Sequence, residues 1–299
     1  MTLKQLEYFV AVADSGSVSG AARHLHISQP PLSMQIRELE EELGTSLLER
    51  TTRHMRLTDA GHLLYDKARA ILDLVEETRG ELESSAENIE GKLIIGYISS
   101  CGNIMLTPQF TEFSKTYPKL DFELLEGHTY AMIDKLMKRE IDLAFLRTPF
   151  NEAGLDCRYF PEEKMCAVGT RSLLGGGDEE LGPVSLQELS KMPLIIYRRF
   201  ESLIRSTFRA GSLPIHVKCL NDDARTSLMW AAAGTGVCLV PSSIAPIISG
   251  PDIVTRTVDC GEFTTHTVIA CRQGQYLSPA ARKFLAVFEE MTSPRGGDR

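Results

Sequence analysis

Residues 17–44 read SVSGAARHLHISQPPLSMQIRELEEELG, and this stretch decides the fold of the N-terminal part of the chain. Ser28 stands where a helix N-cap is expected, and Gly44 stands where the helix that follows should end. Pro30 and Pro31 fall in the first turn of that helix, where a missing backbone N–H costs nothing. The alanine-rich segment before Ser28 predicts a second, shorter helix. The stretch therefore predicts two helices joined by a tight turn, a helix-turn-helix unit.

Periodic apolar residues extend this unit on both sides. Residues 3–13 have helical spacing, and Ser17 is expected to cap the next helix. The helix after Ser28 should bury the stripe formed by Leu32, Ile36, Leu39 and Leu43. Residues 47–57 have two β-capable flanks around an arginine-bearing centre, which predicts a small β-hairpin wing.

A long helix should follow Thr58. Its apolar positions alternate spacings of four and three, as in a coiled coil, at Leu64, Ala68, Ile71, Val75, Thr78, Leu82, Ser85 and Ile89. The opposite face is crowded with acidic residues, so we expect the apolar stripe to pair with a second copy of the chain. The alternative is a lone helix lying on its own domain.

The composition changes at Gly91. Short buried strands and helices alternate from here, which predicts parallel sheets with helices on both faces. The expected strands lie within 93–98, 122–125, 141–146, 167–168, 194–197, 217–220 and 237–240, and the expected helices within 104–117, 131–139, 203–210, 224–233 and 280–291. Since these 209 residues are many for one sheet, we expect two α/β lobes with a cleft between them.

Composition and charge exclude several classes of protein. The 299 residues suggest about two domains, and 43% apolar with 24% charged residues is ordinary for a soluble protein. No apolar run is long enough to span a bilayer, and the charged first residues do not resemble a secretory signal, so we expect a cytoplasmic protein without a membrane partner. The net charge of −8 argues against nonspecific coating of nucleic acid, although residues 1–58 are nearly balanced, with 6 basic and 7 acidic side chains.

The N-terminal residues resemble the DNA-binding domain of LysR-type transcriptional regulators. The resemblance rests on Phe9 to Ala13, Ala21 to Leu25, Ile27 to Ser33, Ile36, Leu39-Glu40, Leu43-Gly44, Leu47 to Arg50 and Leu57 to Gly61. Beyond residue 90 the chain is similar to the family's effector-binding domain in layout and in short pieces at Ile95-Gly96, Pro118 to Leu120, Ile141 to Ala144, Ala233 to Val237 and Val240-Pro241.

The resemblance implies an α+β multi-domain fold. The expected parts are an all-α winged helix-turn-helix domain over 1–58, a linker helix for dimerisation over 59–90, and an effector-binding domain over 91–299. That last domain is expected to be two-lobed α/β, as in periplasmic binding proteins, with one lobe at 91–161 plus 266–299 and the other at 162–265.

The helix after Ser28 is the candidate DNA reader. Its first turn can enter the major groove, where Gln29 can bind adenine bidentately and Ser33, one turn on, can reach a base or a phosphate. The resemblance adds contacts from Ser28, Pro30, Met34, Arg37, Arg50 and Arg53. Met34 stands where the family commonly has a basic residue, so a contact is absent there or is replaced by apolar contact with a thymine methyl group. We expect Arg53 in the minor groove and Arg37 and Arg50 on the DNA backbone, with solvent-exposed charge as the alternative.

The candidate effector site lies between the expected lobes. Hydroxyls and helix N-termini attract anions, which points to Ser99, Ser100, Cys101 and Thr129 in the first lobe. Arg147 ends the third strand, and Arg198, Arg199, Phe200 and Ser202 follow a strand of the second lobe. We therefore predict a small carboxylate effector. The alternative is that these residues are ordinary helix caps and surface arginines.

Other functions are less well supported by the residues. No catalytic, nucleotide-binding or metal-binding motif occurs, so no enzyme, cofactor or metal site is predicted. A solute-binding transport component would suit the C-terminal part alone. A thiol-based redox sensor would use Cys101, although the seven cysteines include no Cys-x-x-Cys pair. The expected partners are double-stranded promoter DNA, the effector, further copies of the chain in a homodimer or homotetramer, and RNA polymerase.

Overall fold

The computed structural model describes residues 1–50, 55–83, 89–175 and 182–294. The chain divides into two compact units, Met1–Glu87 with Gln275–Pro279, and Asn88–Gly274 with Ala280–Arg299. No helix in the described ranges combines the length and the apolar character needed to cross a bilayer.

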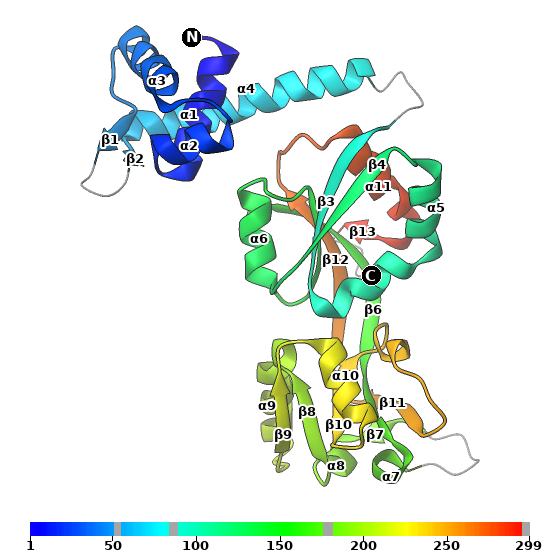
Figure 1. The fold of residues 1–299 in the computed structure, drawn as a ribbon. Coiled ribbons are helices and arrows are strands. Elements are labelled where there is room, and N and C mark those ends of the chain that lie inside the picture. Colours follow the sequence, from blue (N-terminus) through cyan, green and yellow to red (C-terminus); the bar gives the residue numbers. More distant parts are fainter. Residues whose placement is uncertain (51–54, 84–88, 176–181, 295–299) are drawn as a thin grey trace. The chain divides into compact units, whose positions relative to one another are not determined.

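The first unit is a bundle of short helices with a β-hairpin (Figure 1). Its elements are α1 (Leu3–Ser15), α2 (Val18–His24), α3 (Gln29–Leu43), β1 (Leu48–Arg50), β2 (Met55–Leu57) and α4 (Asp59–Glu83). β1 and β2 are antiparallel, with Leu48 opposite Leu57, which confirms the predicted wing as a β-hairpin on an otherwise helical unit.

The turn between α2 and α3 is made without glycine. Ser17 caps α2 as predicted, because its hydroxyl accepts a hydrogen bond from the Gly20 N–H at 3.1 Å. His26 supplies the left-handed conformation of the turn with φ 54°. Ser28 occupies the N-cap of α3 but its side chain makes no capping bond, contrary to expectation. A capping side chain accepts from the second or third helical N–H, and prolines occupy both of those positions here.

The core of the first unit is formed by the inner faces of α1, α2 and α3. Phe9, Leu32 and Leu39 have no exposed surface, so the predicted stripe of α3 is buried over most of its length. Leu43 is the exception, at 40% exposure, because the helix runs past the core in its last turn. Its prediction as a buried residue was wrong.

The wing is joined to the helices at both of its ends. One carboxylate oxygen of Glu40 accepts from the N–H groups of Leu47 and Leu48, at 2.7 and 3.2 Å. At the other end, the Thr58 hydroxyl accepts from the Gly61 N–H at 2.9 Å, which caps α4 as predicted. A Cβ at Gly61 would lie 2.1 Å from the Leu47 carbonyl oxygen, so this close approach of two backbones requires glycine.

The long helix α4 begins as predicted but ends earlier. Ile89 is outside the helix, which is described to Glu83, and Ser85 and the Leu82 side chain lie outside the described residues. Ala68 is fully buried in the unit's own core and Leu64 packs against that core. These two residues are therefore not free for a partner helix, which corrects that part of the predicted dimer surface.

A charged contact fixes α4 against α1. The Arg69 guanidinium donates to the Asp14 carboxylate at 2.5 Å and to the Tyr65 hydroxyl at 2.6 Å. Arg69 is 7% exposed, so most of its charge is removed from water and matched by Asp14. The first turns of α4 consequently belong to the first unit rather than to a separate linker.

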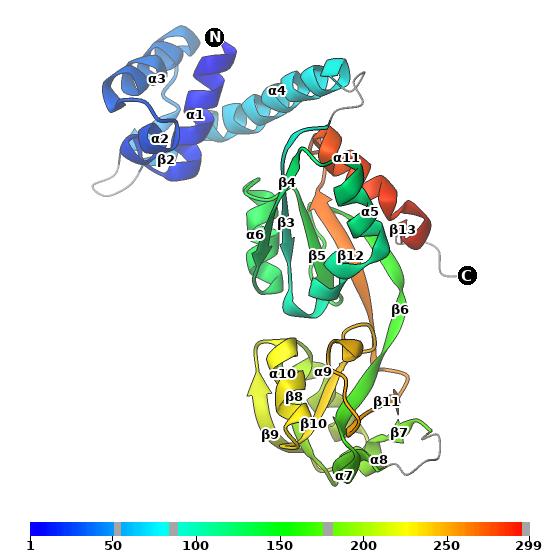
Figure 2. The ribbon, with the colours of Figure 1, turned by 45° about the vertical axis from the view of Figure 1, so that its right-hand side comes forward.

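The second unit contains two lobes that share one strand (Figures 1 and 2). The strand order is β4-β3-β5-β12-β6-β10-β8-β9, and β11, β7 and β13 pair outside this path. The strands are β3 (Gly91–Tyr97), β4 (Leu120–Glu126), β5 (Leu143–Arg147), β6 (Leu155–Thr170), β7 (Val184–Ser185), β8 (Pro193–Tyr197), β9 (His216–Asn221), β10 (Val237–Pro241), β11 (Ile253–Asp259), β12 (Thr264–Arg272) and β13 (Ser293–Pro294).

The strand β6 defines the lobes by changing its partners. Residues 155–164 pair with β12, in the sheet that we call the first lobe. Residues 165–170 pair with β10 and β11, in the sheet that we call the second lobe. Since one continuous strand belongs to both sheets, a small rotation about residues 164–165 would move one lobe relative to the other.

Helices cover both faces of each sheet, as the alternating pattern predicts. In the first lobe α6 lies on one face and α5 with α11 on the other (Figures 1 and 2). Phe113, Phe145 and Phe284 pack edge to face between α5, β5 and α11. The remaining elements are η1 (Ser99–Leu106), α5 (Pro108–Thr116), α6 (Thr129–Met137), α7 (Arg171–Leu174), α8 (Leu186–Leu189), η2 (Arg198–Phe200), α9 (Glu201–Ala210), α10 (Ala224–Ala232), η3 (Ala245–Ile247), α11 (Pro279–Val287) and η4 (Glu289–Met291).

Two expectations for this unit were wrong. The sheets are mixed rather than parallel, because β6 and β12 run antiparallel to their neighbours. β11, β12 and most of β6 were missed. β11 and the first part of β6 mix polar with apolar residues, whereas β12 contains the buried apolar run from Val268 to Cys271, which the sequence analysis overlooked. The helix expected over 104–117 is a 3₁₀ segment, η1, followed by α5, because Thr107 and Pro108 start a new helix.

Gly61→Ala is expected to lower the free energy of unfolding of the first unit by about 1–3 kcal/mol, because the new methyl group meets the Leu47 carbonyl. Replacement of an exposed glycine in a helix by alanine would instead raise the free energy of unfolding, since alanine favours helix by about 1 kcal/mol. Native-state hydrogen exchange of the α4 amides in the full chain measures the effect. His62→Ala, at the exposed neighbouring position, is the control, and a stabilised Gly61→Ala protein would contradict the close approach.

Candidate functional site

The predicted DNA-reading residues form one exposed surface at the start of α3. Ser28, Gln29, Pro30 and Arg37 are exposed, and Met34 is 54% exposed, whereas Ser33 is half-buried. The buried side of the same helix is formed by the apolar stripe described above, which orients the polar side outward. The first two turns of α3 are therefore free to enter a groove.

Charge along α3 restricts which end can approach DNA. Arg37 is the one basic residue of the helix, and Glu38, Glu41 and Glu42 are exposed in its last two turns. Carboxylates repel phosphate, so the end of α3 beyond Arg37 is disfavoured next to the DNA backbone. Only the N-terminal half is compatible with a groove.

The side chain of Gln29 is held by the preceding helix. The Ser19 hydroxyl, in the first turn of α2, donates to Gln29 Oε1 at 3.0 Å. The sequence analysis did not identify Ser19 as part of this surface. The wing arginines are less informative, because Arg50 is described only through its backbone in β1 and Arg53 lies outside the described residues.

The second candidate site is a cavity between the two lobes of the second unit. Its volume is about 780 Å³. The first lobe contributes the start of η1 and the loop into α6, and the second lobe contributes the ends of β8 and β9. The lining residues are Ser99, Glu126, Gly127, His128, Thr129, Tyr130, Tyr197, Arg198, Arg199, Leu220, Asn221, Asp222 and Asp223. Since only one of them is aliphatic, the cavity suits a polar ligand.

Two buried hydroxyls at this place lack partners among the described residues. Thr129 Oγ1 lines the cavity, and Thr129 is 4% exposed. Ser100 Oγ is the second such hydroxyl, on a residue that has no exposed surface and is not part of the cavity lining. A buried hydroxyl without a hydrogen bond costs about 1–3 kcal/mol. The hydroxyl of Thr129, which lines the cavity, indicates a ligand that supplies the missing bond.

Arg199 is a cation without an acidic partner. Its guanidinium donates to the carbonyl oxygens of Arg147 and Pro149, and no carboxylate pairs with it in the part of the chain that the structure describes. Burial lowers the pKa of Arg199, because desolvation disfavours the charged form. Arg198 and Arg225 differ, since Arg198 pairs with Asp222 and Arg225 pairs with Glu126 and Asp223. Arg199 therefore carries the charge available to an anion.

The lobes contact each other across the cavity. Arg225 of the second lobe donates to both carboxylate oxygens of Glu126 in the first, at 2.6 and 2.8 Å. The Ser99 hydroxyl donates to the Tyr197 hydroxyl at 3.3 Å and accepts from the Ala224 N–H at 3.1 Å. The sequence analysis predicted Ser99 but missed Glu126, Tyr197 and Arg225, because nothing local in the sequence pairs them.

Several predicted effector residues lie elsewhere. Ser99, Thr129 and Arg199 line the cavity, whereas Phe200 is buried in the second lobe's core and Ser202 is exposed away from the lining. These last two predictions were wrong, since the turn after β8 directs Phe200 inward. Thr129 is also not the cap of α6, because His128 accepts the capping bond from the Ala131 N–H.

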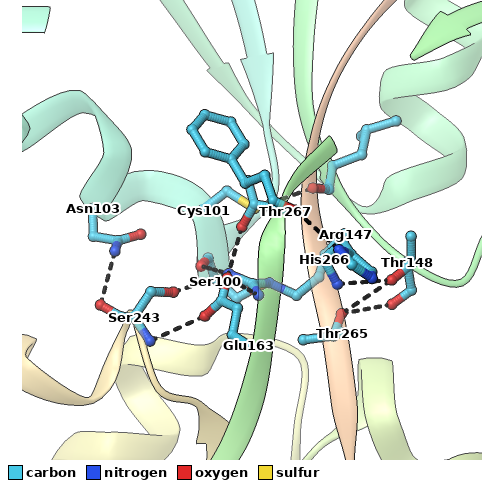
Figure 3. Close-up of polar contacts among 12 residues, drawn as sticks. Ser100, Cys101, Asn103, Arg147, Thr148, Glu163, Ser243, Thr265, His266 and Thr267 are labelled. Carbon is cyan, nitrogen blue, oxygen red and sulfur yellow. Dashed lines mark hydrogen bonds and ion pairs between the residues drawn. The ribbon is translucent and has the colours of Figure 1, made fainter. Parts of the chain in front are cut away.

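Arg147 belongs to a buried network instead of the cavity wall (Figure 3). It has no exposed surface and pairs with Glu163 of β6 at 2.6 Å. The same guanidinium donates to the Ser100 carbonyl and to the Ser243 hydroxyl, at 3.2 and 3.1 Å. Glu163 also accepts from the Thr267 hydroxyl and the Ser243 N–H. Glu163 lies just before Met165, where β6 enters the second lobe. The pair and its hydrogen bonds to Ser243 therefore link both lobes at their shared strand.

Comparison with known proteins identifies the family. The model of bacterial regulatory helix-turn-helix proteins of the lysR family matches residues 3–62, and the model of the LysR substrate-binding domain matches residues 86–293. The chain belongs to the LysR family. It is 31% identical to the transcriptional regulator BudR of Raoultella terrigena, over 96% of this chain and all of BudR.

Solved structures agree with this LysR-family assignment. Full-length CbnR in complex with its target DNA is 26% identical, with a TM-score of 0.58 over 97% of this chain and 99% of CbnR. A full-length OxyR variant of Pseudomonas aeruginosa has a TM-score of 0.70 over 100% of this chain and 99% of that one, and at 22% identity it supports the fold alone. The protein is a DNA-binding transcriptional regulator with an effector-binding domain, not an enzyme.

The structure gives no support to Cys101 as a reactive thiol in this LysR-family protein. Cys101 has no exposed surface and its thiol lies 3.5 Å from the Leu146 carbonyl oxygen. Burial raises the pKa of the thiol, and the nearby Arg147 guanidinium offsets only part of this. A reactive cysteine needs exposure and a lowered pKa, and Cys101 has neither.

Glu163→Gln is expected to cost the second unit about 3 kcal/mol at pH 7, because it leaves the buried Arg147 charge unpaired. Burial alone would raise the pKa of Glu163, but Arg147 and the Ser243 hydrogen bonds outweigh it and lower that pKa. A lowered pKa adds stability above the ordinary glutamate value of about 4.3, and this stability is lost as the pH falls through the folded value.

The melting temperature of wild type, measured by Trp230 fluorescence, should therefore decrease when the pH is lowered past about 4.3. The melting temperature of Glu163→Gln should decrease less over the same pH range. Asp156→Asn, at an exposed carboxylate of the same strand, is the control and should leave the pH profile unchanged. Equal acid sensitivity of wild type and Glu163→Gln would contradict the role of the pair.

Proposed function

We propose that this regulator binds promoter DNA through the start of α3 and that a small organic acid in the interlobe cavity controls this binding. The observation that carries the effector part is the partnerless buried hydroxyl of Thr129, which lines the same cavity as the guanidinium of Arg199. Hydroxyl donors together with an unneutralised guanidinium suit a carboxylate group.

Support for DNA readout comes from α3. Its exposed N-terminal side chains lie opposite a buried stripe, and its acids are confined to the other end. CbnR, which has the same domain order and was crystallised on its target DNA, supports the same mode for this chain. Met34 would then offer apolar contact to a thymine methyl group, since its 54% exposure leaves it free.

The remaining lining of the cavity limits the effector. Glu126, Asp222 and Asp223 also line it, and each has an arginine partner. A ligand with a second charged group would have to break one of these pairs. We therefore infer a compact monocarboxylate whose remaining part bears hydroxyl or carbonyl groups.

Effector binding is proposed to act through the shared strand. A ligand held by both lobes would favour one rotation about residues 164–165 of β6 and so select one arrangement of the regulator. The resulting change in DNA bending and in contact with RNA polymerase would alter transcription.

The proposed assembly is a homodimer, or a pair of dimers, joined through α4. Beyond the residues that pack on its own core, α4 exposes Leu63 at 64%, Ile71 at 36% and Leu74 at 60%, and Val75 is half-buried. Exposed apolar side chains spaced by whole turns of a helix are typical of a helix-pairing surface.

A panel of small monocarboxylates is expected to raise the melting temperature of the full-length protein. Thr129→Val removes the partnerless hydroxyl at constant volume and should weaken binding of the best acid about tenfold. Ser202→Ala, outside the lining, is the matched control and should bind like wild type. If no acid stabilises wild type, or if Thr129→Val binds equally well, the proposal is wrong.

Leu74→Glu is expected to weaken self-association at least about tenfold, because it places a charge at an exposed apolar position of α4. Sedimentation velocity over a concentration series measures the change. Lys67→Glu, an exposed charge change on the same helix, is the control. Unchanged association of Leu74→Glu would show that α4 pairs through another face.

A further inference from the structure

The hydroxyl of Ser19 makes a contact between the two helices of the helix-turn-helix that capping does not require. Ser17, not Ser19, accepts the capping bond of α2. The Ser19 hydroxyl instead donates to Gln29 Oε1 at 3.0 Å, across ten residues of chain. Both residues are exposed on the surface that the proposed function assigns to DNA.

We propose that Ser19 is a positioning residue that sets the orientation of the Gln29 amide for reading adenine. The inference rests on the proposed readout by α3. An amide can turn over, which exchanges its oxygen and its nitrogen, and the two orientations present different groups to a base. In the structure the Ser19 hydroxyl donates to Oε1, so Oε1 lies toward α2 and both Nε2 donors are left for the base.

This orientation remains compatible with adenine. A carbonyl oxygen has two lone pairs, so Gln29 Oε1 can accept from Ser19 and from the adenine N6 amino group at once. Nε2 then donates to adenine N7. Guanine presents an acceptor, O6, where adenine presents the N6 donor. Guanine O6 would therefore face Gln29 Oε1, and two acceptors cannot form a hydrogen bond. The fixed orientation therefore favours adenine over guanine.

The backbone around the two side chains is also restrained. Gln29 is the first residue of α3 and is followed by two prolines. Arg23 Nε donates to the Ser19 carbonyl oxygen at 3.4 Å, within α2. A glutamine side chain loses several rotamers when it binds a base, and a side chain already held in place loses fewer. DNA would also exclude water from the Ser19–Gln29 bond, which strengthens it in the complex.

A rival role for Ser19 is direct contact with a phosphate. Removal of a phosphate contact weakens binding to all sequences alike and changes the salt dependence of binding. Removal of a positioning residue instead changes discrimination at one base pair. The two roles therefore give different results with the same variant.

The test uses full-length protein and a duplex selected by wild type from a randomised library. Fluorescence anisotropy gives the affinity for this duplex and for its adenine-to-guanine variants over a salt series. Gln29→Ala first identifies the base pair that Gln29 reads. At that base pair, Ser19→Ala should lower discrimination about three- to tenfold with an unchanged salt slope, and Ser19→Thr, which keeps the hydroxyl, should restore it.

Ser17→Ala is the structural control, because it removes the α2 cap without touching Gln29. It should lower stability but leave discrimination intact. A uniform loss of affinity with a reduced salt slope in Ser19→Ala, or full discrimination in Ser19→Ala, overturns the inference while leaving the readout by Gln29 in place. If Gln29→Ala itself discriminates like wild type at every position, both the proposed readout by Gln29 and the inference about Ser19 fail.

Discussion

The arrangement of the effector-binding unit depends on one buried ion pair, between Arg147 of β5 and Glu163 of β6. A guanidinium with no exposed surface must be neutralised and hydrogen-bonded, or its desolvation would unfold the site. Glu163 lies in the first-lobe part of β6, close to the point where this strand continues into the second lobe. The Ser243 hydroxyl and N–H, from the second lobe, complete the network, so the charge requirement of a first-lobe residue determines how the second lobe is attached.

The cavity next to this network shows how three arginines acquire different roles. Arg198 and Arg225 are matched by nearby carboxylates, and the charge of Arg225 joins the lobes. Arg199 is left with carbonyl oxygens, which are dipoles and not countercharges. Together with the hydroxyl of Thr129, it gives the cavity a set of unfilled interactions that a ligand of matching polarity would complete.

In the DNA-binding unit, the two prolines after Gln29 have consequences beyond starting a helix. They remove the N–H groups that would have engaged the Ser28 hydroxyl, and so Ser28 stays available at the surface. Gln29 is contacted from α2 by Ser19 instead. The polarity of α3, with acids only toward its C-terminal end, then allows a single direction of approach to a duplex.

The sequence by itself determined the helix-turn-helix, the wing and the alternation of strands and helices, because local spacing, caps and turn residues carry that information. It also located Thr129 and Arg199, which lie beyond the ends of predicted strands, where α/β sheets bind ligands. It placed Phe200 wrongly, since spacing does not reveal which face of an element meets its own core. Only the tertiary structure decided the pairing of Arg147 with Glu163 and the course of β6, whose first-lobe residues 155–164 lack the apolar run that marks a strand. Whether the charge of an arginine is neutralised or stays available to a ligand depends on which carboxylate the fold brings within reach, and no local pattern encodes that distance.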